Sequence, residues 1–200
     1  NGERKQVSVL FSDLSGYTAM TERLDPEEVK EVMDRVFVKV RQVIDKYDGF
    51  IEKFVGDSAM AVFGVPSAHE DDPIRAIRAA MEIHAHVVGL SPEAEEKIGR
   101  PLSMQSGINT GLVITSQVDS DKGTHGLVGE TINLASRLEG LAKRGQILVG
   151  ESTFNLTKSH FNFDRMEPTK VKGKAEPLPV FKLLSPKEKP LALHRLQGVR

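Results

Sequence analysis

Residues 48–64, reading DGFIEKFVGDSAMAVFG, limit the possible folds of the chain more than any other stretch. Positions 50–55 alternate and are rich in β-forming side chains, Gly56-Asp57-Ser58 is a turn signal, and positions 59–63 are apolar. This order predicts a β-hairpin whose turn lifts the Asp57 carboxylate clear of the core. Because aspartate also favours turns for local reasons, a structural role for Asp57 stays open beside a functional one.

A second aspartate follows another predicted strand. Residues 7–11 are mostly apolar, Asp13 comes next but one, and a Ser-Gly-Tyr-Thr turn at 15–18 should open a helix. A carboxylate at a strand end can bind a cation, while loop N–H groups beside it bind phosphate oxygens. If the two strands are neighbours in one sheet, Asp13 and Asp57 form the kind of two-metal site that serves phosphoryl and nucleotidyl transfer.

The composition limits the class of protein. With 200 residues and 39% hydrophobic content, the chain can bury one substantial core, and we expect one domain. The absence of cysteine excludes disulfides and thiolate metal sites, and the six histidines form no convincing metal set. A formal net charge of −1 gives no reason to expect nucleic-acid binding. No apolar run approaches the roughly 20 residues that span a bilayer, so we expect no membrane segment and a cytoplasmic location.

Two long helices are predicted around the hairpin. The first starts at the Asp-Pro pair 25–26, with a capping box closed by Glu28, and ends before Gly49. The second starts at the Asp-Pro pair 72–73 and is expected to end near Gly89.

The order of the remaining segments predicts an α+β fold with helices packed mainly on one face of a sheet. We expect a loop at 91–100, a strand at 102–118 with a bulge or bend at 109–111, a loop or hairpin arm at 119–126, a helix at 130–142, a strand at 147–149, and a strand pair at 161–171 and 178–184. Residues 185–200 are rich in proline and lysine. Since the chain also begins without methionine, we expect a catalytic domain at 1–184 and a linker at 185–200, cut from a longer protein.

The predicted helix at 130–142 carries a polar pair. Asn133 and Arg137 are four residues apart and therefore share one face. An amide and a guanidinium together suit the stabilisation of charge that develops at a phosphorus centre. Lys172, in a tight turn, could add a point charge for terminal phosphates. All three residues are also compatible with an ordinary solvated surface, so both interpretations stay open.

Five separated motifs together resemble the catalytic domain of the class III nucleotidyl cyclases, the adenylate and guanylate cyclases. In chain order they are VSVLFSDLSGYT, GFIEKFVGDSAMAVFG, GINTG, VGETINLASRLEG and VKGKAEPLPVFKL. Five motifs in order are far more specific than a single Gly-rich match. The resemblance implies a ferredoxin-like core with a mostly antiparallel sheet. Within the family, THGLVGETINLASRL is most similar to the soluble, bicarbonate-responsive type, which implies possible regulation by bicarbonate.

The resemblance also implies roles for individual residues. Asp13 and Asp57 would hold two Mg²⁺ or Mn²⁺ ions, with the Leu14 carbonyl oxygen as a further ligand. Asn133 would orient the ribose region, and Arg137 would stabilise the pentavalent transition state. The substrate-binding positions would be Lys53 for the purine, Lys172 for the distal phosphates, the loop residues Ser15, Gly16, Tyr17 and Thr18, and Gly126 at the position that helps to select the base.

By the same resemblance, the chain would be an adenylate cyclase that converts ATP into 3′,5′-cyclic AMP and pyrophosphate in a head-to-tail homodimer. Family members take the metal-binding aspartates of each site from one subunit and the lysine, asparagine and arginine from its partner. This chain carries both sets. Lys53 favours adenine, because a donor suits the unprotonated N1 of that base, whereas Gly126 offers no side chain for the exocyclic amine.

Two alternatives stay open beside the adenylate cyclase. One is a catalytically weak or inactive cyclase-like module that binds nucleotide, or only dimerises, within a larger signalling protein. The other is a related palm-like domain, such as a diguanylate cyclase or a polymerase. The GGDEF-type signature is absent from the chain, and the near-neutral charge disfavours a nucleic-acid template.

Overall fold

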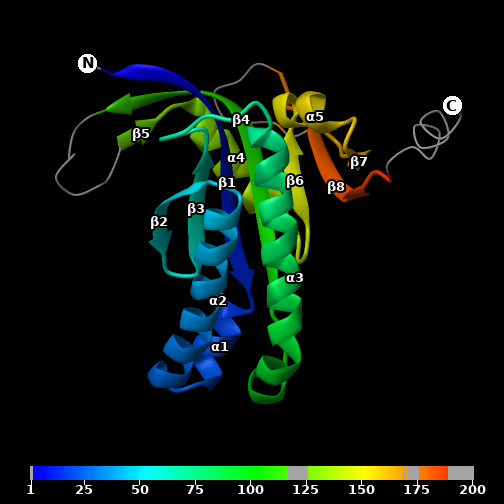
Figure 1. Cartoon of the computed structure of the whole chain (residues 1–200). Coiled ribbons are helices and arrows are strands. Elements are labelled where there is room, and N and C mark those ends of the chain that lie inside the picture. The colour runs from blue at the N-terminus through cyan, green and yellow to red at the C-terminus, as the bar shows by residue number, and fades with distance from the viewer. Residues whose placement is uncertain (1, 117–125, 169, 171–175, 189–200) are drawn as a thin grey trace, which may run out of the picture.

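The computed structural model describes residues 2–116, 126–168, 170 and 176–188 (Figure 1). Its elements are β1 (Glu3–Ser15), α1 (Tyr17–Arg23), α2 (Pro26–Lys46), β2 (Phe50–Val55), β3 (Ser58–Phe63), α3 (Asp72–Ile98), β4 (Ser103–Ser116), β5 (Gly126–Val128), α4 (Glu130–Leu141), β6 (Ile147–Gly150), α5 (Glu151–Thr157), β7 (Phe161–Arg165) and β8 (Val180–Pro186). The hairpin predicted at 48–64 is confirmed as β2 and β3.

The strands form one sheet in the order β2-β3-β1-β4-β6-β8-β7, with β5 paired to β4. Among the described strands, only β4 and β6 pair in parallel, and the other pairs are antiparallel. The unit β1-α2-β2-β3-α3-β4, with its strands ordered 2-3-1-4, has the connectivity of a ferredoxin-like core. The predicted α+β class with a mostly antiparallel sheet is therefore confirmed.

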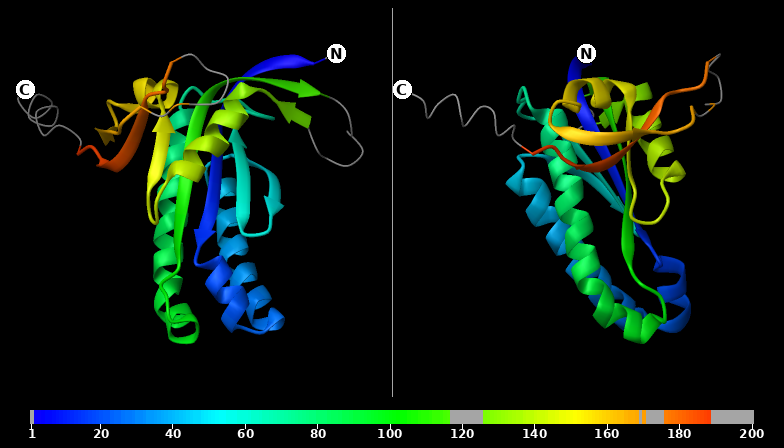
Figure 2. Two further views of the ribbon diagram at one scale, coloured as in Figure 1. Left: turned by 180° about the vertical axis from the view of Figure 1, so that it is seen from behind. Right: turned by 90° about the vertical axis from the view of Figure 1, so that its right-hand side faces the viewer.

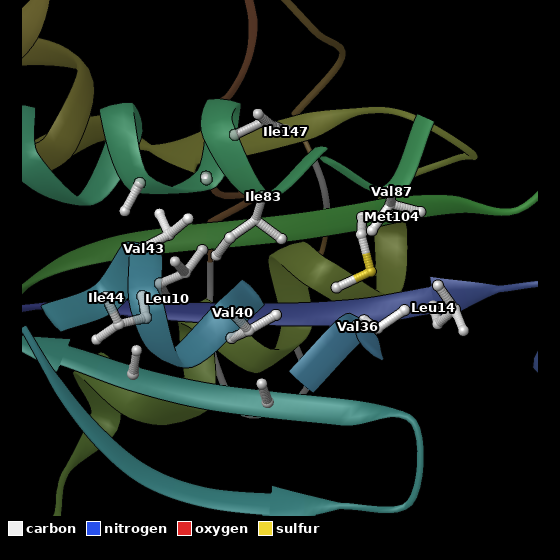
Figure 3. Close-up of a cluster of buried hydrophobic side chains, with 14 of the residues drawn as sticks. Leu10, Leu14, Val36, Val40, Val43, Ile44, Ile83, Val87, Met104 and Ile147 are labelled. Carbon is white, nitrogen blue, oxygen red and sulfur yellow. The ribbon is translucent and has the colours of Figure 1, made fainter. Parts of the chain in front are cut away.

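Alternate residues of β1 face two hydrophobic clusters on the two sides of the sheet. Helices α3 and α4 lie on opposite faces of this sheet (Figure 2). Leu10 and Leu14 pack against residues of α2 and α3 in the larger cluster, part of which is drawn in Figure 3. Val7 and Val9 pack in a smaller cluster that includes Ala135 of α4. Because successive side chains of a strand point to opposite faces, Asp13 lies on the face that α4 covers. Helices α1, α2 and α5 each contact α3.

The helix signals in the sequence hold at the start of each long helix and fail at the end of α3. The capping box of α2 forms as predicted, with Glu28 reaching back to the Asp25 backbone N–H. However, α3 does not end near Gly89, and the loop predicted at 91–100 is wrong. Val87, Ser91, Ala94 and Ile98 continue its buried stripe, and this packing outweighs the helix-breaking tendency of Gly89 and Pro92.

Of the bulge or bend predicted at 109–111 in β4, the bulge is also wrong. Strand β1 runs from Glu3 to Ser15, longer than predicted, and pairs with β4 without a register shift. The glycines of β4 instead make room for α4. A Cβ atom at Gly111 would lie 2.6 Å from the Thr131 hydroxyl, and one at Gly107 would lie 2.2 Å from the Glu139 backbone nitrogen. Helix α4 therefore rests almost directly on the backbone of β4.

The C-terminal part of the chain differs from the prediction in three further respects. Helix α5 was not predicted, strand β7 ends at Arg165 rather than near 171, and β8 runs from Val180 to Pro186 rather than from 178 to 184. Residues 119–125 of the loop or hairpin arm expected at 119–126, the segment 171–175 and most of the expected linker lie outside the described residues.

Two short series of buried hydroxyl groups cross the sheet on its α3 face. Ser12 bonds to Ser106 at 2.7 Å, and Ser106 bonds to the Nε2 atom of His84 at 2.8 Å. Burial lowers the pKa of His84 to about 4, so this histidine is neutral at physiological pH. Ser8 and Thr110 bond at 2.9 Å in the same way, and these pairs fasten β1 to β4.

Replacing Gly107 with alanine should lower the free energy of unfolding by about 1–3 kcal/mol, because the new methyl group must push α4 off the sheet. Gly140→Ala is the matched control on α4 itself. Nothing lies within 4 Å of the Cβ position at Gly140, so this change should add a few tenths to about 1 kcal/mol through helix propensity. Urea denaturation of both variants measures the difference. Equal stability of the two variants would contradict the close contact.

Candidate functional site

The structure brings Asp13 and Asp57 together at the ends of neighbouring strands. Asp13 pairs across the ladder with Ser58, the residue that follows Asp57. The Leu14 N–H also donates to the Asp57 carbonyl oxygen at 3.1 Å, which ties the hairpin turn to the end of β1. The adjacency on which the predicted two-metal site depends is therefore present.

The environment of Asp13 opposes a negative charge. Burial raises the pKa of Asp13 to about 7, and the Asp57 carboxyl group adds to the shift through hydrogen bonding and charge repulsion, followed by Glu139. The Oδ1 atom of Asp13 is buried and has no hydrogen-bond partner among the described residues. A buried carboxylate oxygen without a donor, beside a second carboxylate, fits a hard divalent cation that takes oxygen ligands.

Glu139 is the site residue that sequence reasoning missed. It lies on the sheet-facing side of α4, where Gln105 donates a hydrogen bond to its Oε1 atom at 3.1 Å. Gln105 itself is the β4 partner of Asp13. Glu139 follows Ala135 by four residues and therefore lies on the same side of the helix, but the structure is what shows that Ala135 is buried, so the spacing alone gave no signal.

The loop after Asp13 forms the predicted helix start. Ser15 ends β1, and Gly16 adopts a positive φ of 100° before α1 begins. Tyr17 packs against the larger hydrophobic cluster, while Thr18 is exposed. Leu14 is buried between these elements.

The other predicted site residues lie elsewhere. Asn133 and Arg137 are exposed on α4, and neither side chain forms a hydrogen bond or an ion pair with another described residue. Arg137 lines a cavity of about 230 Å³ between α4, the β6–α5 junction and residues 178–180. Lys53 is exposed on β2, opposite Met60. Within the described part of one chain, none of these three side chains contacts the aspartate pair.

Two predicted positions fall at or beyond the limits of the described structure. Gly126 is the first residue of β5 and pairs with Ser116 of β4. Lys172 lies outside the described residues, so its place relative to Arg137 stays a prediction.

The described ranges hold no second candidate metal site. These ranges contain no group of three or more His, Cys, Asp or Glu residues that could hold a metal ion. None of the helices described is long and apolar enough to cross a membrane. The aspartate pair, with Glu139 beside it, is therefore the candidate site.

Comparison with known proteins shows one family over most of the chain. The family model described as "Adenylate and Guanylate cyclase catalytic domain" matches residues 1–184. An adenylate cyclase of Anabaena cylindrica is 28% identical over 194 residues, covering 90% of this chain and 37% of the relative. Adenylate cyclase 1 of Rhizobium meliloti is 27% identical over 185 residues, covering 90% of this chain and 28% of the relative. The chain thus spans about a third of the length of these curated relatives.

Solved structures of both substrate types are similar to the chain. The crystal structure of the adenylyl cyclase CyaB from P. aeruginosa has a TM-score of 0.87 and 29% identity, and the match covers 95% of this chain and 98% of that one. A guanylyl cyclase crystal structure has a TM-score of 0.85 and 31% identity, covering 94% of this chain and 96% of that one. Overall likeness therefore does not separate the two substrates.

Replacing Asp13 with asparagine should change how stability depends on pH in metal-free buffer. Because the pKa of Asp13 is higher in the folded state than its ordinary value of 3.8, the folded protein retains a proton that the unfolded chain releases. Its stabilising effect is fully present below about pH 4 and is lost as the pH rises to about 7. Asp13→Asn should therefore be more stable than the wild type at about pH 8, by about 1–2 kcal/mol after allowance for solvent screening.

Urea denaturation at several pH values in the presence of a chelator measures this difference. Titration of His84 occurs in both proteins and cancels in the comparison. Asp164→Asn, at an exposed position of β7, is the control and should leave the dependence of stability on pH unchanged. If the wild type is more stable than Asp13→Asn at alkaline pH, the ionised Asp13 is not destabilised by burial and neighbouring carboxyl groups, and the interpretation is wrong.

Proposed function

Because the chain belongs to the family of adenylate and guanylate cyclase catalytic domains, we propose that it is an adenylate cyclase that converts ATP into 3′,5′-cyclic AMP and pyrophosphate. The observation that carries this proposal is the meeting of Asp13 and Asp57 at two strand ends, with a buried Asp13 oxygen that has no described donor. Such a pair is suited to cations that carry a triphosphate.

Asp13 and Asp57 would hold two Mg²⁺ or Mn²⁺ ions, with the Leu14 carbonyl oxygen as a further ligand. When bound, these ions would lower the pKa of the ribose 3′-hydroxyl and neutralise charge on the triphosphate. The protein side chains then position the nucleotide so that the hydroxyl attacks the α-phosphorus as pyrophosphate leaves. The loop Ser15–Thr18 would donate backbone N–H groups to the phosphates.

The remaining catalytic side chains would come from a second copy of the chain. Asn133 would orient the ribose region, Arg137 would stabilise the pentavalent phosphorus, and Lys172 would hold the distal phosphates. In support of sharing, Asn133 and Arg137 are exposed, have no described side-chain partner and do not contact the acid pair of their own chain. We therefore propose a head-to-tail homodimer with two equivalent sites.

Mixing two inactive variants tests this arrangement. Asp57→Ala and Arg137→Ala should each lose at least about 100-fold in pyrophosphate release from MnATP. In an equimolar mixture, half of the dimers are mixed, and each mixed dimer has one intact site. Activity should therefore return to about one quarter of the wild-type value.

The control mixture combines Asp57→Ala with Asp13→Ala. Both changes affect the acid pair, so no mixed dimer has an intact site and activity should stay low. Activity restored in this control, or no recovery in the first mixture, would count against shared sites.

Lys53 supports the choice of ATP over GTP. A lysine can donate a hydrogen bond to the unprotonated N1 of adenine, whereas guanine presents N1–H, which needs an acceptor. By the family resemblance, guanylate cyclases carry glutamate at the position of Lys53. Gly126 provides no side chain for the exocyclic amine, so we expect reduced discrimination between the two nucleotides. The proposal therefore includes weak activity on GTP.

Replacing Lys53 with glutamate should move the ratio of MnATP to MnGTP turnover toward GTP by about 10-fold or more, roughly the effect of one exchanged hydrogen bond. Lys39→Glu makes the same charge change at an exposed position of α2 and should leave the ratio unaltered. Measurement of kcat/KM for both nucleotides decides the question. An unchanged ratio in Lys53→Glu would remove this residue from base selection.

The second candidate function is a nucleotide-binding or dimerisation module with little or no catalysis. Gly126 is the observation that favours it, because the base-selecting position has no side chain. This candidate gains if the purified chain binds nucleotide but releases pyrophosphate from neither MnATP nor MnGTP. Regulation by bicarbonate and a cytoplasmic location remain parts of the proposal that rest on the sequence alone.

A further inference from the structure

Glu139 occupies a position that the adenylate cyclase proposal leaves without a role. Its side chain lies against the β4 residue that pairs with Asp13 across the ladder. Gln105, the cross-strand partner of Asp13, donates to Glu139 at 3.1 Å and fixes the direction of its side chain. The same chain therefore places a third acid beside the aspartate pair, and it does so from α4 rather than from a strand.

The backbone beneath Glu139 fixes its distance from the sheet. The position that a Cβ atom would take at Gly107 is 2.2 Å from the Glu139 backbone nitrogen and 2.5 Å from the Ala135 carbonyl oxygen. No side chain separates helix from strand at this point. The closeness of Glu139 to Asp13 is thus a property of the packed backbone and not of one rotamer.

Glu139 lies beside the two aspartates as an additional negative charge. Within the described ranges, no three acidic or imidazole side chains are grouped to hold a metal ion. The role assigned to Glu139 is therefore that of a charge beside the two aspartate ligands. A fixed negative charge just beyond the ligands raises the affinity of a cation site through Coulomb attraction. Without a cation, the same charge opposes a negative charge on Asp13.

We propose that Glu139, held by Gln105 over Gly107, is a positioning residue that strengthens divalent-cation binding at Asp13 and Asp57 of its own chain. The inference rests on the proposed function, since it concerns the cations of that reaction. Helix α4 also carries Asn133 and Arg137 on its exposed side. A cation at the acid pair therefore attracts the helix whose other face is proposed to serve the partner's nucleotide.

Titration of the metal-free chain with Mn²⁺ alone tests the inference, with the electron paramagnetic resonance signal of free Mn²⁺ as the readout. Glu139→Gln keeps the shape of the side chain and its contact with Gln105 but removes the charge. It should weaken Mn²⁺ binding by about 3- to 10-fold, whereas the wild type and Glu96→Gln, an exposed acid on α3, should bind alike. Gln105→Leu, which frees Glu139, should give a smaller loss.

The stability of the metal-free variants separates this role from a structural one. Glu139→Gln should unfold at the same or a higher urea concentration than the wild type, because repulsion from Asp13 is relieved, and Mn²⁺ should then stabilise it less. A side chain that only supports the fold would give lower metal-free stability and unchanged Mn²⁺ affinity. That result would overturn the inference.

Asp13→Asn in the same titration distinguishes failure of the inference from failure of the proposed function. If Asp13→Asn abolishes Mn²⁺ binding and Glu139→Gln binds as tightly as the wild type, only the role of Glu139 is refuted. If neither variant changes Mn²⁺ binding, the cation site at the aspartate pair is refuted as well, and the two-metal mechanism with it.

Discussion

The pairing of β1 with β4 is the constraint on which the rest of the structure depends. It runs without a register shift from Glu3 opposite Thr115 to Ser15 opposite Ser103. On one face it supports the hydrophobic cluster shared with α2 and α3, and on the other it supports α4. A shift of one residue would exchange the two faces, moving Asp13 into the core and Leu14 to the site. The location of the acidic site is therefore set by the same register that forms the core.

The acidic site is electrostatically unfavourable in the metal-free chain. Burial and two neighbouring carboxyl groups raise the pKa of Asp13, and its Oδ1 atom has no described donor. Carboxyl groups that repel one another and lack hydrogen-bond donors are typical of functional positions. Packing elsewhere in the fold must hold them together. Here the backbone contact of α4 with Gly107 and the hydrogen bond between Leu14 and Asp57 provide that restraint.

Local patterns in the sequence predicted the elements whose ends carry their own signals. The hairpin turn at Gly56, the capping box at Asp25 and the helix start at the Asp-Pro pair 72–73 all appear in the structure. The errors arose where distant contacts outweigh local preference. Burial carries α3 past Gly89 and Pro92, and the glycines of β4 serve close helix packing rather than a bulge.

The site was predicted in part for the same reason. Asp13 and Asp57 each follow a strand, so their meeting required only that the two strands be neighbours. Glu139 reaches them from a helix more than 80 residues away in sequence from Asp57, and its partner Gln105 has no distinguishing local pattern. Residues that depend on such tertiary contacts cannot be assigned from spacing alone.

The irregular half of α3 has a consequence for the end of the sheet that bears the acids. Pro92 lacks an N–H group, so one backbone hydrogen bond is missing in the helix, and Gly89 adds conformational freedom near it. Val87, just before this point, packs in the same cluster as Leu14 and Met104 (Figure 3). Ser91 accepts a hydrogen bond from the Leu102 N–H at 2.9 Å. The strand ends beside the acid pair are thus buttressed by the portion of α3 that is least able to stand as a helix by itself. Local opening there would loosen the packing beneath the acid pair and leave the opposite end of the sheet intact.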